Sequence, residues 1–288
     1  MPGTIIVGLD GSTESRAAAE WAAREAGLRG LAVTLVHVWQ PVPEPMALAS
    51  FLGDETHQHW AERIPREAVE ALKTRHPEVE VTVEQRNGAP AEVLLEAAAD
   101  AELLVLGSRA LGGIGGFLVG SVGQSVVART DRPVVLVRAG GEVSDGRSVV
   151  LGLDVAHPDD LVIAFAFEEA RRRSAPLTAV HSWNLPSPYV NSLALAGGYD
   201  PRDDIADAQA GALAEVLKPW REKYPEVEVA EKSGFGSPAG RLIDESKEAA
   251  LVVVGRRVRR SPFGVHIGSV AHAVMHHSVA PVAVVAHD

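Results

Sequence analysis

Glycines and small hydroxyl residues gather in one segment of the first half of the sequence. It reads Gly107-Ser108-Arg109-Ala110, then nine residues, then Gly120-Ser121, and it stands between an apolar run and a new helix. The unpaired amides at a helix N-terminus attract an anion, and the helix dipole adds to that attraction. Four glycines within residues 112–116 would let the connecting loop wrap a polyphosphate. These residue types favour phosphate binding.

The same spacing returns in the second half. There it reads Gly255-Arg256-Arg257-Val258, nine residues, then Gly268-Ser269, displaced by 148 positions. The four arginines at positions 256, 257, 259 and 260 add four guanidinium groups beside this loop. A second anion site is therefore predicted.

Two better-known phosphate motifs do not fit the first segment. Gly115 to Gly120 followed by Ser121 lacks the Lys of the GxxxxGK[ST] loop, and it follows the fourth apolar run of its half instead of the first. The alternative G-x-G-x-x-G pattern fails because Leu118 stands where its third Gly should be. Both a Walker A loop and a Rossmann dinucleotide site are disfavoured.

Length and composition indicate what class of protein carries these segments. A chain of 288 residues is about twice a usual domain of ~100–150 residues, and 46% hydrophobic with 23% charged residues is typical of globular proteins. The net charge of −11 disfavours nucleic acid and anionic membranes as partners. The absence of Cys, of a membrane-spanning apolar run and of an export signal predicts a cytoplasmic protein.

The chain repeats itself. Gly8-Leu9-Asp10 returns as Gly152-Leu153-Asp154 after 144 positions, whereas Pro77–Val81 returns as Pro225–Val229 after 148. The second copy therefore carries four extra residues between Trp183 and Pro225, and the loop 184–200 is expected to contain them. The Gly-rich stretch 139–146 reads as a linker, which predicts domains at residues 1–140 and 145–288.

Short β-branched runs alternate with longer Ala/Glu-rich stretches, as in βαβ units on a parallel sheet covered on both faces. The expected strands are 4–10, 32–39, 79–85, 102–107 and 134–137, then 149–154, 177–183, 227–231, 251–255 and 282–285. The expected helices of the first copy are one that Ser12 or Thr13 caps and that runs through Leu28, then 61–75, 91–99 with Pro90 in its first turn, and one opened by Gly120-Ser121. Each half is predicted to be a five-stranded α/β layer.

This element order, the opening Val7–Ser12 and the G-x-x-G-x9-G-[S/T] spacing resemble the universal stress protein family, here as a tandem pair covering nearly the whole chain. The resemblance implies two Rossmann-like domains of the adenine nucleotide alpha hydrolase type, each with strand order 3-2-1-4-5. It also implies ATP bound at the carboxyl edge of each sheet, with Mg²⁺ as a possible companion.

Carried over by position, the resemblance implies two sets of nucleotide-binding residues. Those of the first copy are Asp10, Gly11, Ser12, Val38, Gly107, Arg109, Gly120, Ser121 and Val122. Those of the second are Asp154, Ser182, Gly255, Arg257, Gly268, Ser269 and Val270. No metal ligand and no catalytic residue is assigned.

The sequence departs from the family pattern in two places. The second glycine of the motif is Ala110 in the first copy and Val258 in the second, so a backbone with positive φ or a close phosphate approach is expected to be strained. Asp10-Gly11-Ser12 also becomes Asp154-Val155-Ala156, which loses the hydroxyl. The first copy is expected to bind nucleotide more reliably.

Several other residues could do chemistry but favour structural roles. His37 and His181 occupy the same strand end and are expected to be buried packing residues; Asp10 and Asp154 could instead cap the first helix of each copy. His272 and His276 have the i, i+4 spacing of a metal pair without an evident third ligand. The run 171–173 of three arginines is expected to end a helix.

The sequence thus predicts an ATP-binding regulator of the stress response without dedicated catalysis. Two alternatives remain: a slow ATPase or nucleotidyl-transferring enzyme on the same scaffold, and an interaction module whose nucleotide sites have decayed. The fifth strands, 133–137 and 281–285, are short, apolar and at a sheet edge, so the halves are expected to pair there as a pseudo-dimer. A homodimer of the whole chain is a further possibility.

Overall fold

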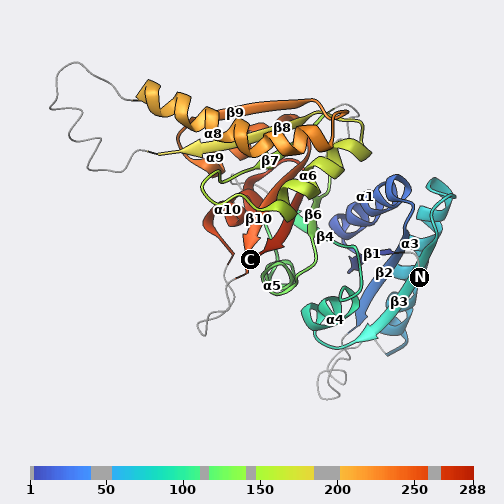
Figure 1. Cartoon of the computed structure of the whole chain (residues 1–288). Helices are drawn as coiled ribbons and strands as arrows, with labels where there is room; N and C mark the ends of the chain where they lie inside the picture. The colour runs from blue at the N-terminus through green and yellow to red at the C-terminus, as the bar shows by residue number, and fades with distance from the viewer. Residues whose placement is uncertain (1–2, 40–53, 111–116, 141–146, 185–201, 259–266) are drawn as a thin grey trace. The chain divides into compact units, whose positions relative to one another are not determined.

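A computed structural model of the chain describes residues 3–39, 54–110, 117–140, 147–184, 202–258 and 267–288 (Figure 1). It divides into two compact units, with the break inside the Gly-rich stretch 141–146. The loop 185–201, where the sequence places the insertion, lies outside the described residues, as do Arg259 and Arg260. Each unit is described by itself below.

The first unit is built on five parallel strands. They are β1 (Thr4–Leu9), β2 (Ala32–Trp39), β3 (Val81–Asn87), β4 (Leu103–Ala110) and β6 (Val134–Arg138). Their order across the sheet is β3-β2-β1-β4-β6, which confirms the predicted 3-2-1-4-5 arrangement.

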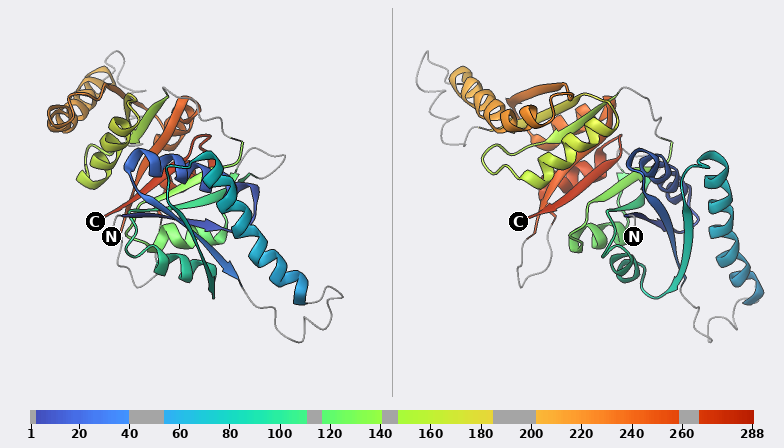
Figure 2. Two further views of the ribbon diagram at one scale, coloured as in Figure 1. Left: turned by 90° about the vertical axis from the view of Figure 1, so that its right-hand side faces the viewer. Right: turned by 45° about the vertical axis from the view of Figure 1, so that its right-hand side comes forward.

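Helices cover both faces of this sheet, as right-handed crossovers between parallel strands require. They are α1 (Thr13–Arg29), α3 (Asp54–Arg75), α4 (Pro90–Ala97) and α5 (Ser121–Arg129). α1 packs with α3 on one face and α4 with α5 on the other (Figure 1, Figure 2). The predicted caps are confirmed: Ser12 caps α1, Pro90 occupies its first-turn position, and Gly120 is the N-cap of α5.

The second unit repeats the plan. Its strands are β7 (Ser148–Gly152), β8 (Leu177–Trp183), β9 (Val229–Phe235), β10 (Ala249–Arg257) and β11 (Val282–His287), in the order β9-β8-β7-β10-β11. Its helices are α6 (Asp160–Arg172), α8 (Arg202–Lys223), α9 (Pro238–Glu245), the 3₁₀ turn η1 (Ser246–Glu248) and α10 (Ser269–His277). The predicted α/β fold with two similar halves is confirmed.

The element boundaries differ from the prediction in instructive ways. β3 and β9 begin two residues later than expected and run two and four residues further, because polar residues can occupy an edge strand whose outer side faces water. β4 continues to Ala110, where a two-residue strand β5 (Phe117–Leu118) pairs antiparallel with Arg109 and Ala110. The sequence had indicated only a loop there.

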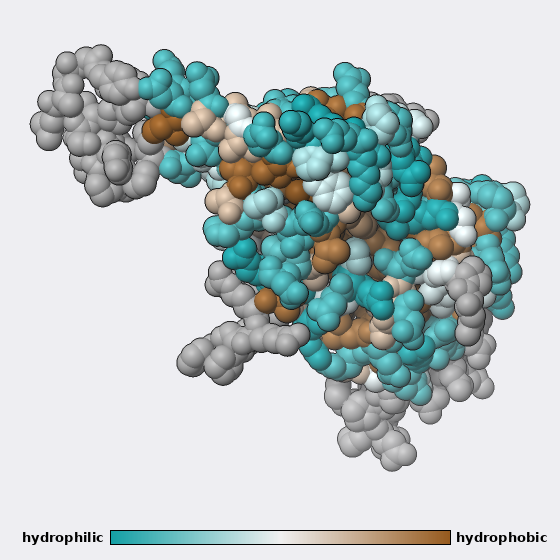
Figure 3. Space-filling view, in the orientation of Figure 1, coloured by the Kyte–Doolittle hydropathy of each residue, from teal (hydrophilic) through white to brown (hydrophobic). Residues whose placement is uncertain are grey.

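The core of each unit consists of the central strands and the inner faces of the helices. Ile5, Leu35 and Leu104 are fully buried in the first unit, as are Leu151 and Phe167 in the second. Figure 3 shows a surface that is mostly hydrophilic, with apolar residues in scattered patches. No helix within the described ranges is long and apolar enough to cross a membrane.

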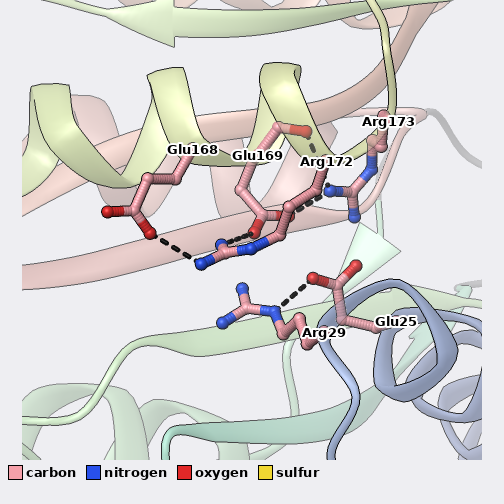
Figure 4. A network of polar contacts seen from close by, with 6 residues as sticks. All are labelled: Glu25, Arg29, Glu168, Glu169, Arg172 and Arg173. Atoms are coloured by element: carbon pink, nitrogen blue, oxygen red, sulfur yellow. Dashed lines mark hydrogen bonds and ion pairs between the residues drawn. The ribbon is translucent and has the colours of Figure 1, made fainter. Parts of the chain in front are cut away.

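Each unit buries an ion pair in its first helix, at positions 144 residues apart (Figure 4). In α1, Arg29 Nε lies 2.5 Å from Glu25 Oε1, and the Glu25 side chain is 1% exposed. In α6, the Glu169 side chain is fully buried and accepts hydrogen bonds from Arg172 and Arg173. The run of arginines ends the helix, as predicted, and two of its members pair with a buried carboxylate.

The pairing of the two halves through their fifth strands stays a prediction with a direct test. Within its own unit, each fifth strand has one neighbouring strand, β4 for β6 and β10 for β11. Val135→Pro or Ala283→Pro would remove one backbone donor from these strands and should loosen the halves. Limited proteolysis across 139–146 would then be several-fold faster than in the parent; unchanged cleavage and melting would refute the pairing.

Candidate functional site

The ends of three strands bring the predicted residues of the first copy to one edge of the sheet. Leu9 pairs with His37 and Val7 with Val105. Extending this register places Asp10, Val38 and Ser108 at the same level, at the carboxyl edge. Gly107 lies one residue earlier in β4, and the fold therefore gathers residues that are up to 98 positions apart in the sequence.

Asp10 shapes the turn from β1 into α1. Its Oδ1 accepts hydrogen bonds from the Ser12 amide at 3.0 Å and the Ser12 hydroxyl at 2.5 Å. Ser12 Oγ in turn accepts from the Ser15 amide at 3.1 Å, and Gly11 between them has a φ of +82°, which favours glycine. Asp10 is exposed and orients the cap without being the cap itself, because that residue is Ser12.

A buried histidine fixes the end of the second strand in both copies. His37 Nδ1 donates to the Leu9 carbonyl at 2.8 Å, and His181 Nδ1 donates to the Leu153 carbonyl at 3.1 Å. His181 Nε2 also lies 2.9 Å from Gln209 Oε1 of α8. The predicted packing role of the two histidines is confirmed. In each copy the histidine holds the backbone of the leucine directly before Asp10 or Asp154.

Gly107 serves the packing of the protein itself. A Cβ atom built on it would lie 2.6 Å from the Glu14 carbonyl carbon and 2.7 Å from the Ser15 amide nitrogen. The first turn of α1 therefore rests directly against the backbone of β4. A glycine at a strand end can admit the close approach of a ligand, but on this face the group that approaches Gly107 is the helix.

Gly107→Ala should accordingly destabilise the protein by about 1–3 kcal/mol, because the rigid helix backbone cannot move aside without loss of packing. Urea denaturation measures the change. Gly255→Ala is the matched control: the space at Gly255 is taken by the His287 and Val162 side chains, which can turn, so a smaller loss is expected. Equal stability of Gly107→Ala and the parent would contradict this account of Gly107.

The two helices that follow the glycine segments begin without any capping side chain. α5 starts after Gly120 and α10 after Gly268, and neither has a side-chain cap or an acidic residue in its first turn. In contrast, α1 and α6 are capped by Ser12 and Asp159 and carry an acidic residue in the first turn. The positive ends of α5 and α10 are thus not neutralised by capping or acidic side chains of their own.

Neither helix-start glycine is required by backbone conformation or packing. Gly120 and Gly268 have φ values of −59° and −56°, which any residue adopts, and a Cβ on either would meet no atom within 4 Å. Ser121 and Ser269 beside them are exposed, and Val122 and Val270 are partly exposed. These positions present backbone amides and hydroxyls on the surface, where a bound anion could reach them.

The second copy differs at the turn after its first strand. Asp154 Oδ1 accepts from the Ala156 amide at 3.1 Å, and its Oδ2 lies 3.3 Å from His157 Nδ1. α6 starts later than α1 relative to the repeat and is capped by Asp159, which accepts from the Leu161 amide at 2.9 Å. The two Asp residues therefore begin different turns, and Asp154 does not cap the helix.

His287 takes the place beside Gly255 that α1 takes beside Gly107. Its Nε2 would lie 2.8 Å from a Cβ on Gly255, and its Nδ1 lies 3.4 Å from Asp159 Oδ2. The position that matches His287 in the first copy is Ala139. A side chain from β11 thus fills the space that the later helix start leaves open.

Each copy also places one buried arginine next to its glycine segment. Arg138 in β6 pairs in register with Ser108, and Arg256 in β10 pairs with Ala286, so the arginine has changed strands between the copies. Burial lowers the pKa of Arg138 to about 10, and the side chain still carries its charge at neutral pH. Arg257 is exposed, whereas Arg256 is 2% exposed and lies within the sheet, not on the loop as the sequence had suggested.

The prediction of positive-φ strain at the altered motif glycines is wrong. Ala110 is an ordinary strand residue of β4, paired with Phe117. Ser174 is the only non-glycine residue with positive φ in the described ranges, so Val258 is not forced into that region either. The backbone reason for ranking the first copy above the second therefore disappears.

The part of the chain that the structure describes contains no set of side chains arranged to bind a metal ion. The rings of His272 and His276 lie in α10 with centroids 4.4 Å apart and planes tilted by 34°, and no group of three or more His, Asp or Glu residues converges there or elsewhere in those ranges. The side chain of Arg109 lies outside what is described.

Sequence reasoning missed several residues at this edge. Asp159 and His287 were not singled out, nor was Ser108, whose buried hydroxyl has no hydrogen-bond partner within the described ranges. Arg241 was missed as well. Aligning the two copies residue by residue and asking where a bulky side chain replaces a small one would have indicated His287 against Ala139 and Arg241 against Val93.

Comparisons with known proteins agree with this geometry. The model of the universal stress protein family matches residues 1–138 and again 146–286. A universal stress protein of Mycobacterium tuberculosis strain H37Rv is 35% identical over 295 residues, covering 97% of this chain and 96% of that protein. The crystal structure of a universal stress protein from Archaeoglobus fulgidus superposes with a TM-score of 0.69 at 16% identity, covering 99% of this chain and 98% of that one.

Two shorter solved structures are described with ligands. One is a universal stress protein in complex with cAMP, 26% identical and covering 48% of this chain and 98% of its own, with a TM-score of 0.36. The other is a universal stress protein family member from Arabidopsis thaliana with AMP bound, 16% identical and covering 48% and 93%, also with a TM-score of 0.36. With the family model matched twice and relatives aligned end to end, this chain belongs to the universal stress protein family, in its tandem two-domain form.

Proposed function

We propose that the chain is a nucleotide-dependent regulator of the stress response that binds ATP at the carboxyl edge of each domain and has no dedicated catalytic activity. The observation that carries the proposal is the pair of uncapped helices, α5 and α10. Each follows a glycine segment after the fourth parallel strand, and each starts at a glycine that the protein's own packing does not need. Phosphate oxygens would accept from these amides.

Charged side chains at the carboxyl ends of the strands also support a nucleotide ligand. Arg138 lies in β6, one strand away from Gly107, and Arg256 directly follows Gly255 in β10. Asp10 contributes a carboxylate on the other side of the edge, where a ribose hydroxyl or a base amine could donate to it. ATP offers both kinds of group, an anionic end and a donor-bearing end.

Mg²⁺, if it accompanies the nucleotide, would be held mainly by phosphate oxygens and water, as is usual for this ion. Asp10 offers an exposed carboxylate at this edge of the first copy, although its Oδ1 already accepts two hydrogen bonds from Ser12. The described residues contain no cluster that would hold the ion by itself.

Identification of the ligand tests the proposal directly. Protein purified without added nucleotide would be denatured, and the released small molecules would be identified by mass spectrometry. ATP is expected, with a raised melting temperature on adding it back. Release of no nucleotide, together with no stabilisation by millimolar ATP, would contradict the proposal and favour an interaction module.

A further inference from the structure

The carboxyl edge of the second domain carries an arginine that lies flat on a strand. A Cβ atom on Gly234 of β9 would lie 2.0 Å from Arg241 Nη1, 2.6 Å from its Cζ and 2.9 Å from its Nη2. Arg241 belongs to α9, and its guanidinium therefore occupies the space that any other residue at position 234 would fill. Gly234 thus leaves a space on β9 that the Arg241 guanidinium fills, and we call this space the Arg241 seat.

Ser182 stands next to that seat. It pairs in register with Gly234, so its side chain points to the same face of the sheet, on a strand roughly 5 Å away. Its Oγ is buried and has no hydrogen-bond partner among the described residues. A hydroxyl left in this state costs about 1–3 kcal/mol, which makes a ligand group the natural partner for it.

Arg241 is the unneutralised cation of this face. Within the ranges that the structure describes, its guanidinium makes no hydrogen bond and no ion pair, whereas Lys232 on the same face pairs with Glu245 at 2.7 Å. On the opposite face, Arg221 pairs with Glu231 at 2.7 Å. The fold thus pairs these neighbouring cations and leaves the donors of Arg241 available beside a buried hydroxyl.

The first domain is built differently at the same place. Val38 stands where Ser182 does, and its register partner is Arg86. The Arg86 guanidinium is engaged by Glu84, with Nη2 to Oε2 at 2.7 Å, and the matching helix position is Val93. At this place the first domain therefore has an apolar side chain and an arginine that is already paired. The second domain has a hydroxyl and an arginine whose donors are available.

Resting on the proposed nucleotide binding, we propose that the second domain, which also binds ATP, prefers a purine with a 6-oxo group, such as guanine, whereas the first prefers adenine. Arginine presents only donors, and its planar fork matches the O6 and N7 acceptors of guanine. Adenine turns a donor, its 6-amino group, toward the same fork. Ser182 pairs in register with Gly234, the residue under this fork, and its hydroxyl can donate to the same oxo group.

The test isolates the second site in the full-length chain. With Gly120→Val silencing the first site, calorimetric titration with GTP, ITP and ATP should give GTP and ITP an affinity about tenfold or more above that of ATP. ITP separates the 6-oxo group from the 2-amino group of guanine. ATP binding as tightly as GTP in this background would overturn the inference.

Variants then assign the preference to its residues. Arg241→Leu and Ser182→Val should each bring the GTP to ATP ratio down toward one without lowering the melting temperature of the ligand-free protein, and Arg241→Lys should recover only part of the preference, because an ammonium lacks the fork. Arg86→Leu in a Gly268→Val background is the matched control, and ATP binding there should change less than twofold. An unchanged ratio in Arg241→Leu would overturn the assignment, whereas no binding of any of the three nucleotides at either site would overturn the proposed function itself.

Discussion

Gly120→Val is expected to weaken nucleotide binding at the first domain by about a hundredfold or more, equivalent to roughly 2.7 kcal/mol, while the fold persists. The variant side chain would project from the start of α5 into the path of a phosphate that approaches the Ser121 and Val122 amides. The protein itself has room for it, since no atom lies within 4 Å of the added Cβ and the backbone φ of −59° suits any residue. Isothermal titration calorimetry with ATP measures the loss.

Two further glycines make this experiment specific. Gly211→Val adds the same side chain in α8, again with no atom within 4 Å, and should leave both binding and its stoichiometry unchanged. Gly268→Val should silence the second domain alone. Full first-site affinity in Gly120→Val would show that the start of α5 does not hold the ligand.

Glu169→Ala is expected to cost about 3–5 kcal/mol of unfolding free energy, the usual result of removing one partner of a buried ion pair. The Glu169 side chain is fully buried and is bonded by two arginines, one of them at 3.0 Å. Removing the carboxylate leaves the partly buried guanidinium groups of Arg172 and Arg173 without this acceptor. Urea denaturation of the parent and the variant gives the difference.

Glu168 supplies the control on the same helix turn. Its side chain is 38% exposed and pairs with Arg172 at 2.7 Å, so Glu168→Ala should cost no more than about 1 kcal/mol. Glu25→Ala, at the equivalent buried position of α1, should behave like Glu169→Ala. Similar small losses for all three variants would mean that burial of the carboxylate adds little to either pair.

The repetition of the sequence made most of the fold predictable. Val, Ile and Leu runs that are apolar on both faces can only be strands of a sheet covered on both sides, and the strands 32–39 and 177–183 match the structure residue for residue. The helix starts at Ser12, Pro90 and Gly120 were predictable as well, because capping depends on local chemistry that a single sequence displays.

Other features were beyond the sequence because they depend on contacts between distant segments. The pairing of Phe117 with Ala110 extends β4 through the altered motif position, so the strain that a lone Ala there suggested does not exist. The role of Gly107 is set by α1, nearly a hundred residues earlier. The seat of Arg241 combines a strand glycine with a helix arginine, and neither residue type is unusual in its own segment.

The seat at Gly234 also constrains the order in which the two domains diverged. An arginine at 241 can adopt its present rotamer only when position 234 lacks a side chain, since the nearest guanidinium nitrogen would stand 2.0 Å from a Cβ there. Starting from a common ancestor that resembled the first domain, with Arg at the strand position and Val on the helix, a helix arginine could take its present position only once the glycine was there. Such a history leaves epistasis between positions 234 and 241, in which the effect of Arg241 on ligand binding depends on a glycine at position 234.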